Sequence, residues 1–343
     1  MTSSALHSDP RFAGSPKDLM ARVASKLFIA TLFGLLLCSA TLAQPDSDAV
    51  LASDQAMLQK LAGYIDCIND HSNWVTKSRK RYFSWLKSPE KGPTGKEELV
   101  YGLYALQDNR RCREAVERAA SLAPANPTLE KAGAAYAQTL VAAEFVVKEA
   151  DNYYALENYK DDQMRRGKAM HPQLVAAYSA FAAASDSLYE QVVGLQDAIT
   201  ERRLQRLAQD PAQRADFLIE QLMMRAKQAI DSATGMGDKD FAREPFTGAV
   251  DALEQAWREF DEYRQANPDH PQTAIRHSSF GTAAFDLLKS TKAARRRELA
   301  GFKFDDGETI LIEASAGQLV DGHPVQLIER YNGFVNAANS ARQ

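Results

Sequence analysis

The stretch PQLVAAYSAFAAASDSLYEQVVGLQDAIT, residues 172–200, decides the fold class. Its apolar positions recur every three or four residues, with one serine among them: Leu174, Tyr178, Phe181, Ser185, Leu188, Val192, Leu195 and Ile199. Because an α-helix turns once every 3.6 residues, this spacing places all of them along one helical face. The stretch therefore predicts a long amphipathic helix that buries one face against neighbouring helices.

The same pattern recurs along most of the chain. From residue 58 the seam contains Leu58, Leu61, Ile65, Ile68, Ser72, Val75, Arg79, Tyr82 and Leu86. Turn signals and prolines predict further helices over residues 110–122, 127–166, 245–266 and 271–299, and others beginning at Pro211 and Pro324. We therefore expect an all-α fold, an elongated bundle of long antiparallel amphipathic helices, with residues 44–343 forming a single helical domain.

Residues 301–323 differ in composition from the predicted helices. Residues 301–323, GFKFDDGETILIEASAGQLVDGH, contain several glycines and a β-branched patch, TILIE, without a helical stripe. This composition predicts an irregular segment or a short pair of β-strands.

The N-terminal residues 1–43 are typical of an extension followed by a secretory signal peptide. Residues 27–43, LFIATLFGLLLCSATLA, form an apolar run after Arg22 and Lys26, and the run ends in small residues. Its uncharged core is too short to span a bilayer, which takes about 20 apolar residues. We expect cleavage between Ala43 and Gln44 and export to the bacterial periplasm; translation can begin at Met1 or at Met20.

Cys38 leaves a second possibility open. A bacterial lipoprotein is acylated on a cysteine at the end of its signal, which would anchor the protein to a membrane. Leu37 before this cysteine does not fit the small residue that such processing prefers. Soluble export is the favoured interpretation, with lipidation of Cys38 as the alternative and the sole membrane attachment that the sequence offers.

Two cysteines, Cys67 and Cys112, remain after cleavage. An even pair in an exported protein favours one disulfide, because the compartment is oxidising. Two buried free thiols are the alternative.

The charge balance argues against nucleic-acid partners. Cleavage would remove four basic and two acidic residues, leaving 37 basic and 43 acidic side chains and a formal net charge of −6. Nonspecific nucleic-acid binding depends on an excess of lysine and arginine. The one dense basic run, Arg295–Arg297, is interpreted as a solvated helix end.

Catalytic and cofactor motifs are missing from the sequence. There is no H-E-x-x-H, no G-x-S-x-G, no C-x-x-C-H, no P-loop and no G-x-G-x-x-G. The histidines are scattered, so no metal site is predicted. We expect a protein that is not an enzyme and that carries no cofactor.

The stretch YYALENYKDDQMRRGKAMHP, residues 153–172, is rich in groups that bind ligands. The favoured interpretation is a turn between two long helices, with Gly167 as a C-cap and His171 in the turn before Pro172. The alternative is a small-ligand or metal site, for which the candidate residues are Tyr154, Tyr159, Asp162 and His171.

Asparagines on the last helix add two candidates. Asn332 and Asn336 are four residues apart and share one helical face, although asparagine is a poor helix former. Solvent exposure is the favoured explanation, followed by an interhelical polar network and then by a ligand-binding face.

Three segments carry a resemblance to a known family: LAGYIDCIND (61–70), YYALENYKDDQMRRGKAMHPQL (153–174) and VDGHPVQLIERYNGFVNAAN (320–339). In this order they resemble the YiiG-like family of bacterial envelope proteins, predicted lipoproteins that carry a domain of unknown function. The resemblance covers about residues 55–340. It implies a helical envelope protein, often lipid-anchored, and it brings no catalytic residues.

The function expected from the sequence is that of an exported, non-catalytic helical protein of the cell envelope. Such a protein would bind an unknown envelope partner or serve a structural role. The alternative is a helical bundle in the periplasm that binds a small ligand or a metal ion.

Overall fold

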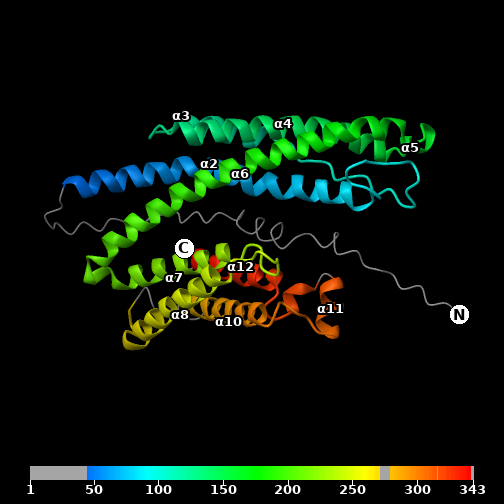
Figure 1. Ribbon diagram of the computed structural model, residues 1–343. Helices are drawn as coiled ribbons and strands as arrows, with labels where there is room; N and C mark the ends of the chain where they lie inside the picture. The colour runs from blue at the N-terminus through cyan, green and yellow to red at the C-terminus, as the bar shows by residue number, and fades with distance from the viewer. Residues whose placement is uncertain (1–44, 271–278, 315, 341–343) are drawn as a thin grey trace. The chain divides into compact units, whose positions relative to one another are not determined.

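The computed structural model describes residues 45–270, 279–314 and 316–340, and this part of the chain is all-α, as predicted (Figure 1). The signal segment, with Cys38, Ala43 and Gln44, lies outside the described residues, as does the predicted helix start at 271–278. In chain order the helices are α2 (Pro45–Ser84), α3 (Arg110–Ser121), α4 (Pro127–Ala155), α5 (Asn158–Asp161), α6 (Arg165–Ala208), η1 (Pro211–Gln213), α7 (Arg214–Ser232), α8 (Arg243–Ala266), α10 (Phe280–Leu299), α11 (Asp306–Glu313), η2 (Gly317–Leu319) and α12 (Pro324–Ser340).

The chain divides into two compact units. Helix α6 contributes its residues up to Ala198 to the N-terminal unit, and the C-terminal unit begins at Ile199. Each unit is described by itself below, and the prediction of a single domain over residues 44–343 stays a prediction. None of the described helices has both the length and the apolar character needed to cross a membrane.

The N-terminal unit is built on the seams of α2, α4 and α6 (Figure 1). The polar interruptions of two seams meet in its interior, because the Ser72 hydroxyl of α2 lies 3.3 Å from the Ser185 hydroxyl of α6. Tyr136 of α4 joins them, with its hydroxyl 2.9 Å from that of Ser72. Gly133 lets α4 approach the ring of Tyr64 closely, since a Cβ at this position would lie 2.2 Å from Cε1 of that ring.

Helix α3 is fastened to α2 in two ways. The predicted disulfide between Cys67 and Cys112 is confirmed, and both cysteines are buried. One end of α3 is held by Lys60, which is completely buried. Its ammonium donates to the backbone oxygens of Leu122 (2.8 Å) and Pro124 (3.1 Å) and to the carboxylate of Glu130 at the start of α4.

The C-terminal unit packs α7 against α8, and α10 against both α8 and α12. Phenylalanine rings form the centre of its core, with ring centroids 5.6 Å apart for Phe260 and Phe280 and 5.0 Å apart for Phe280 and Phe334. Of the three arginines near the end of α10, Arg296 is exposed as predicted, but the other two are not simply solvated, which corrects the prediction for them. Arg295 forms an ion pair with Asp251, and Arg297 is only 13% exposed.

The structure of residues 301–323 differs from the predicted irregular segment or short β-strands. The TILIE patch belongs to α11, which begins with a capping box: the Asp305 carboxylate accepts the Glu308 backbone N–H, and the Glu308 side chain accepts the Asp305 N–H. The guanidinium of Arg297 holds the same Glu308 carboxylate through two nitrogens. The cap outweighs the strand preference of the β-branched side chains, because it satisfies backbone groups that a lone strand leaves unpaired.

Replacing Asp305 by alanine removes this cap. We expect the free energy of unfolding to fall by about 1 kcal/mol, measured by urea denaturation. The matched control is Asp306→Ala, one position inside α11, where the carboxylate makes no capping bond and the expected loss is smaller. Equal losses for the two variants would contradict the assignment of Asp305 as the cap.

Candidate functional site

The candidate site is the segment that joins α4 to α6, and it differs from the predicted helix hairpin. Helix α4 ends at Ala155 rather than near residue 166, and α6 begins at Arg165 rather than at Pro172. His171 and Pro172 thus lie inside α6, because proline removes one helical hydrogen bond without having to end the helix. Gly167 also lies within α6 instead of capping α4.

The backbone of this segment is strained. Glu157, Gln163 and Met164 all adopt positive φ angles, of 55°, 55° and 65°. Non-glycine residues avoid this region, which costs on the order of 1 kcal/mol or more for each residue. Strain of this kind persists only where the surroundings hold it in place, so the contacts of the segment decide its role.

Those contacts form an aromatic group that we call the tyrosine cluster. It combines residues from four helices of the N-terminal unit with the residue that follows α2: Tyr82 of α2, Trp85 directly after α2, Tyr153 and Tyr154 of α4, Tyr159 of α5 and His171 of α6. Neighbouring ring centroids lie 5.0–6.3 Å apart, within the range of favourable aromatic contacts.

Tyr82 and His171 form the buried centre of the cluster. The Tyr82 hydroxyl lies 2.9 Å from Nδ1 of His171. The imidazole also interacts with the backbone oxygens of Pro89 and Glu90, so the neutral ring donates there and accepts the Tyr82 proton at Nδ1. Burial lowers the pKa of His171 and raises the pKa of Tyr82, which keeps both groups neutral at pH 7.

Tyr154 presents a different situation, because its buried hydroxyl has no partner at full hydrogen-bond geometry. The Tyr82 hydroxyl gives its own proton to His171, and its oxygen lies near enough to Tyr154 to accept only a weak bond from it. Burial, and then this neighbouring hydroxyl, raise the pKa of Tyr154 far above its usual range. An orphaned buried hydroxyl is uncommon in a folded protein and marks the least satisfied point of the cluster.

Asp162 supports the turn. One of its carboxylate oxygens accepts the Tyr153 hydroxyl at 2.7 Å, and the other accepts the backbone N–H of Arg166 at 2.9 Å, in the first turn of α6. Burial acts to raise the pKa of Asp162, but these hydrogen bonds outweigh it and keep the pKa below its usual range. Both oxygens of the carboxylate are therefore already used within the fold.

The loop after α2 covers the cluster. Trp85 donates from Nε1 to the backbone oxygen of Gly102 at 2.8 Å. Gly92 and Gly102 both have positive φ angles and touch the cluster with their backbones. A Cβ on Gly92 would lie 2.5 Å from Cγ of His171, and one on Gly102 would lie 3.0 Å from Cβ of Tyr154. Glycine at these two positions allows the loop to close over the rings.

The structure therefore brings some of the predicted candidates together and not others. Tyr154 and His171 are in the cluster, Tyr159 lies half-buried at its edge, and Asp162 holds Tyr153. Asn332 and Asn336 belong to α12 in the C-terminal unit, and the cluster is built without them. Asn336 is exposed and Asn332 half-buried, and neither amide has a side-chain hydrogen bond within the described part of the chain, as solvent exposure predicts.

Sequence reasoning missed Tyr82 and Trp85 as members of the site. Tyr82 is visible in the sequence as a seam residue of the first helix, but its partner His171 lies 89 residues further along the chain. No local signal connects the two.

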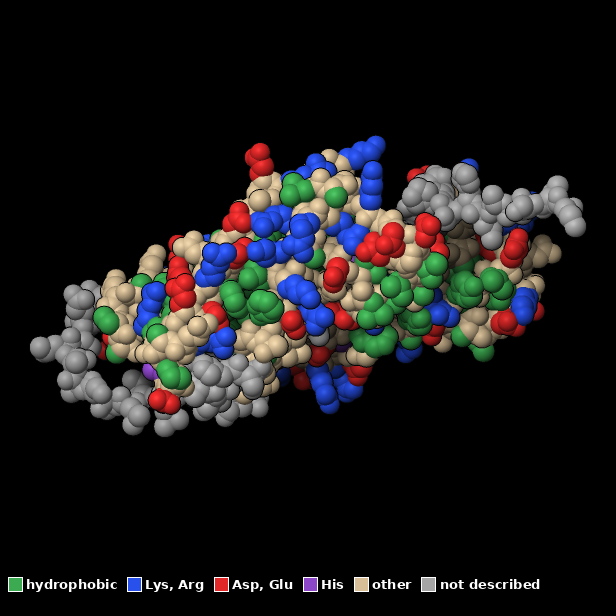
Figure 2. Space-filling view, turned by 90° about the horizontal axis from the view of Figure 1, so that it is seen from below, with side chains coloured by type: hydrophobic (Ala, Val, Ile, Leu, Met, Phe, Trp, Pro, Cys, Tyr) green, Lys and Arg blue, Asp and Glu red, His purple; other side chains and the backbone are tan. Residues whose placement is uncertain are grey.

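The chemistry of the cluster is that of neutral, mutually bonded groups. Burial raises the pKa of the phenols of Tyr82, Tyr153 and Tyr154, to about 12 for Tyr153, so these three do not supply a phenolate nucleophile at neutral pH. Among the described residues no group of three or more His, Cys, Asp or Glu side chains could hold a metal ion. Figure 2 shows that Lys and Arg side chains on the surface have acidic side chains beside them, and that hydrophobic side chains form separate groups.

Burial of His171 predicts a dependence of stability on pH. The pKa of the folded histidine lies below the unfolded value of 6.5, so below pH 6.5 the unfolded chain takes up a proton that the folded chain does not. The stabilisation is complete above pH 6.5 and is lost as the pH falls below it. Desolvation also lowers the pKa of His71, which is buried, and of His323, which is half-buried, so both act in the same direction.

His171→Gln tests this in chemical denaturation between pH 5 and 7.5. We expect the variant to show a shallower loss of stability below pH 6.5, by at most about 1.4 kcal/mol per pH unit, which corresponds to one proton. The same slope in the variant and the parent would contradict the role of His171.

A family model described as a protein of unknown function, DUF3829, matches residues 55–340. The chain belongs to the DUF3829 family. A curated relative, the uncharacterized protein YiiG of Escherichia coli (strain K12), is 27% identical over 305 residues, which cover 88% of this chain and 84% of the relative. No solved structure gave a significant match. The predicted resemblance to the YiiG-like family is thus confirmed, and the DUF3829 match includes most of the described residues of both units and the whole tyrosine cluster.

Proposed function

We propose that this DUF3829 member is an exported protein of the bacterial cell envelope with a partner-binding or structural role rather than a catalytic one. The observation that carries the proposal is the buried disulfide between Cys67 and Cys112. Disulfides persist in oxidising compartments and are rare in the cytosol. Together with the signal-like run at residues 27–43, it supports an extracytoplasmic location.

The tyrosine cluster supports a non-catalytic role. Asp162, Tyr82 and His171 each complete hydrogen bonds that hold the turn and the covering loop. A general base or nucleophile needs a free, reactive form aimed at a substrate. These groups serve the fold instead, so we propose that the cluster is a rigid support for a surface that other molecules contact.

The experiment is an intact-mass measurement on protein recovered from fractionated bacteria that express the full chain. We expect residues 44–343, lighter by two hydrogens, in the periplasmic fraction. A product that begins at Cys38 with acyl chains would support the membrane-anchored form of the proposal. Uncleaved protein in the cytosol with reactive Cys67 and Cys112 thiols would overturn it.

A matched pair of variants tests the export signal. Leu35→Arg places a charge in the middle of the apolar run and should abolish cleavage, whereas Leu35→Ile keeps the run apolar and should not. Cleavage of both variants would contradict a signal peptide at residues 27–43.

The second candidate is a small-ligand or metal site in the tyrosine cluster, favoured by the orphaned Tyr154 hydroxyl. A bound molecule that accepts or donates one hydrogen bond would satisfy that group. Native mass spectrometry with an elemental scan tests it on the purified protein. A retained molecule or metal that is lost in Tyr154→Phe would support this candidate, and identical spectra without added mass would contradict it.

A further inference from the structure

Helix α4 carries a second seam that the core does not use. Its buried seam faces α2 and α6, while seven other residues are all exposed and follow one another at steps of three or four: Lys131, Ala134, Gln138, Val141, Phe145, Lys148 and Asn152. The apolar members, Ala134, Val141 and Phe145, occupy the middle of this face, and polar or charged residues occupy its two ends. Phe145 lies in the middle of the outer seam and is 73% exposed, the largest value among the exposed large hydrophobic side chains described.

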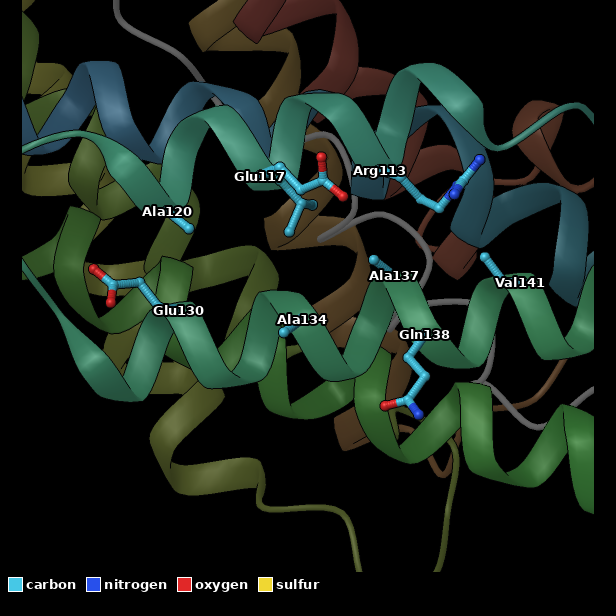
Figure 3. A pocket seen from close by; sticks show the side chains of 9 residues that line it. Arg113, Glu117, Ala120, Glu130, Ala134, Ala137, Gln138 and Val141 are labelled. Atoms are coloured by element: carbon cyan, nitrogen blue, oxygen red, sulfur yellow. The ribbon is translucent and has the colours of Figure 1, made fainter.

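A groove borders this seam. It lies between α3 and α4 and has a volume of about 290 Å³. Figure 3 shows the two helices running in opposite directions, with Arg113, Glu117 and Ala120 on α3 facing α4. The apolar residues Val116, Ala120, Ala134, Ala137 and Val141 line it. The face therefore combines a protruding phenyl ring with an apolar depression that begins one helical turn away.

The charges on the same face are also complementary to one another. Glu117 borders the groove, and Lys148 lies one turn beyond Phe145 on the seam. Both side chains are exposed, and neither has an ion pair or hydrogen bond among the described residues. In a two-fold symmetric contact between two copies of this face, the anion of each copy can pair with the cation of the other.

We propose that this face binds a second copy of the chain, with the two α4 helices antiparallel about a two-fold axis near Val141. Such an axis places Phe145 opposite Ala137 of the partner subunit, because both residues are four positions from Val141. Each Phe145 then enters the groove of the other subunit. Lys148 comes opposite Ala134 of the partner subunit, seven positions from the axis on each side, and so next to Glu117 of the partner subunit.

The outer seam of α4 is long enough to form a homodimer interface. Residues 131–152 span about 32 Å at 1.5 Å per residue, enough for three heptads of antiparallel contact. A membrane surface is a poorer occupant, because Glu117 and Gln138 would meet the lipid beside Phe145. The proposal goes beyond the proposed function and does not depend on export.

Sedimentation equilibrium of the disulfide-bonded chain 44–343 over a wide concentration range tests the dimer. We expect reversible dimerisation in the parent and, in Phe145→Glu, a dissociation constant raised by about 30-fold or more, as for a central hot-spot residue. The control is Leu299→Glu on α10, where the parent side chain is 71% exposed, and it should dimerise like the parent. A monomeric parent, or an unchanged constant in Phe145→Glu, would overturn the proposal.

Charge exchange tests the arrangement of the two copies. Glu117→Lys and Lys148→Glu should each weaken the dimer, and the double variant should regain the lost affinity because both new pairs again have opposite charges. If the loss of dimer affinity in the double variant equals the sum of the losses in the two single variants, the antiparallel register is contradicted.

A cross-link locates the axis. Val141→Cys, treated with a short bis-maleimide, should give a covalent dimer, since residues at a two-fold axis face their own copies. Lys131→Cys, far from the axis, should not. Dimerisation without a cross-link at residue 141 would assign the interface to another face and overturn the proposal.

Discussion

The double substitution Cys67→Ala and Cys112→Ala removes the disulfide and is expected to lower the free energy of unfolding by about 4 kcal/mol. The two cysteines are 45 residues apart, and closing a loop of this length removes about that much conformational entropy from the unfolded chain. Urea denaturation of the purified chain 44–343 measures the loss. Alanine avoids leaving a buried hydroxyl in place of the sulfur.

Reduction of the parent protein provides the control. The reduced parent should lose stability to a similar extent as the double variant, because both lack the same constraint on the unfolded chain. A loss below about 1 kcal/mol in both proteins would show that the constraint contributes little.

The second large effect is expected for Lys60→Met. The substitution keeps most of the volume of the side chain but removes the ammonium that three backbone oxygens and Glu130 share. We expect a loss of about 3 kcal/mol in the free energy of unfolding, since the backbone carbonyls and the half-buried Glu130 carboxylate all lose the donor that they share. The substitution also removes the main cause that keeps the pKa of Glu130 low.

Lys131→Met is the matched control. Lys131 lies one residue after Glu130 on α4 but is exposed, so its substitution should change stability by no more than about 0.5 kcal/mol. Equal losses of stability at the two positions would contradict the conclusion that Lys60 holds the end of α3 and the start of α4 together.

The helices could be predicted from the sequence wherever seam and terminal signals agree. Residues 110–121, 245–266 and 324–340 are helical as expected, and Asp210 caps the segment after α6 through the N–H of Ala212. The helices at 245–266 and 324–340 combine an apolar stripe with a proline in the first turn, whereas residues 110–121 follow a turn without a side-chain cap. Such signals act within one or two turns, so a sequence reading captures them.

The prediction failed where distant contacts decide the backbone. The break after Ala155 depends on residues held at positive φ by the tyrosine cluster, and the members of that cluster come from helices up to 89 residues apart. In residues 301–323 the error was different, because Asp305 and Glu308 are a visible capping signal that the β-branched patch obscured. Candidate residues such as Asp162 and His171 could be identified by type, but their hydrogen-bond partners could not.

The contact between Ser72 and Ser185 has a consequence for which packing of the helices is allowed. Apart from Arg79 of α2, the rest of the two seams consists of similar apolar side chains, and helices of this kind can slide past one another by a turn with little loss of contact area. A slide of one turn would move both hydroxyls against aliphatic neighbours, at a cost of about 1–3 kcal/mol for each group left unbonded. Two small polar side chains thus exclude the alternative alignments, in the way that a single buried asparagine fixes the alignment of a coiled coil.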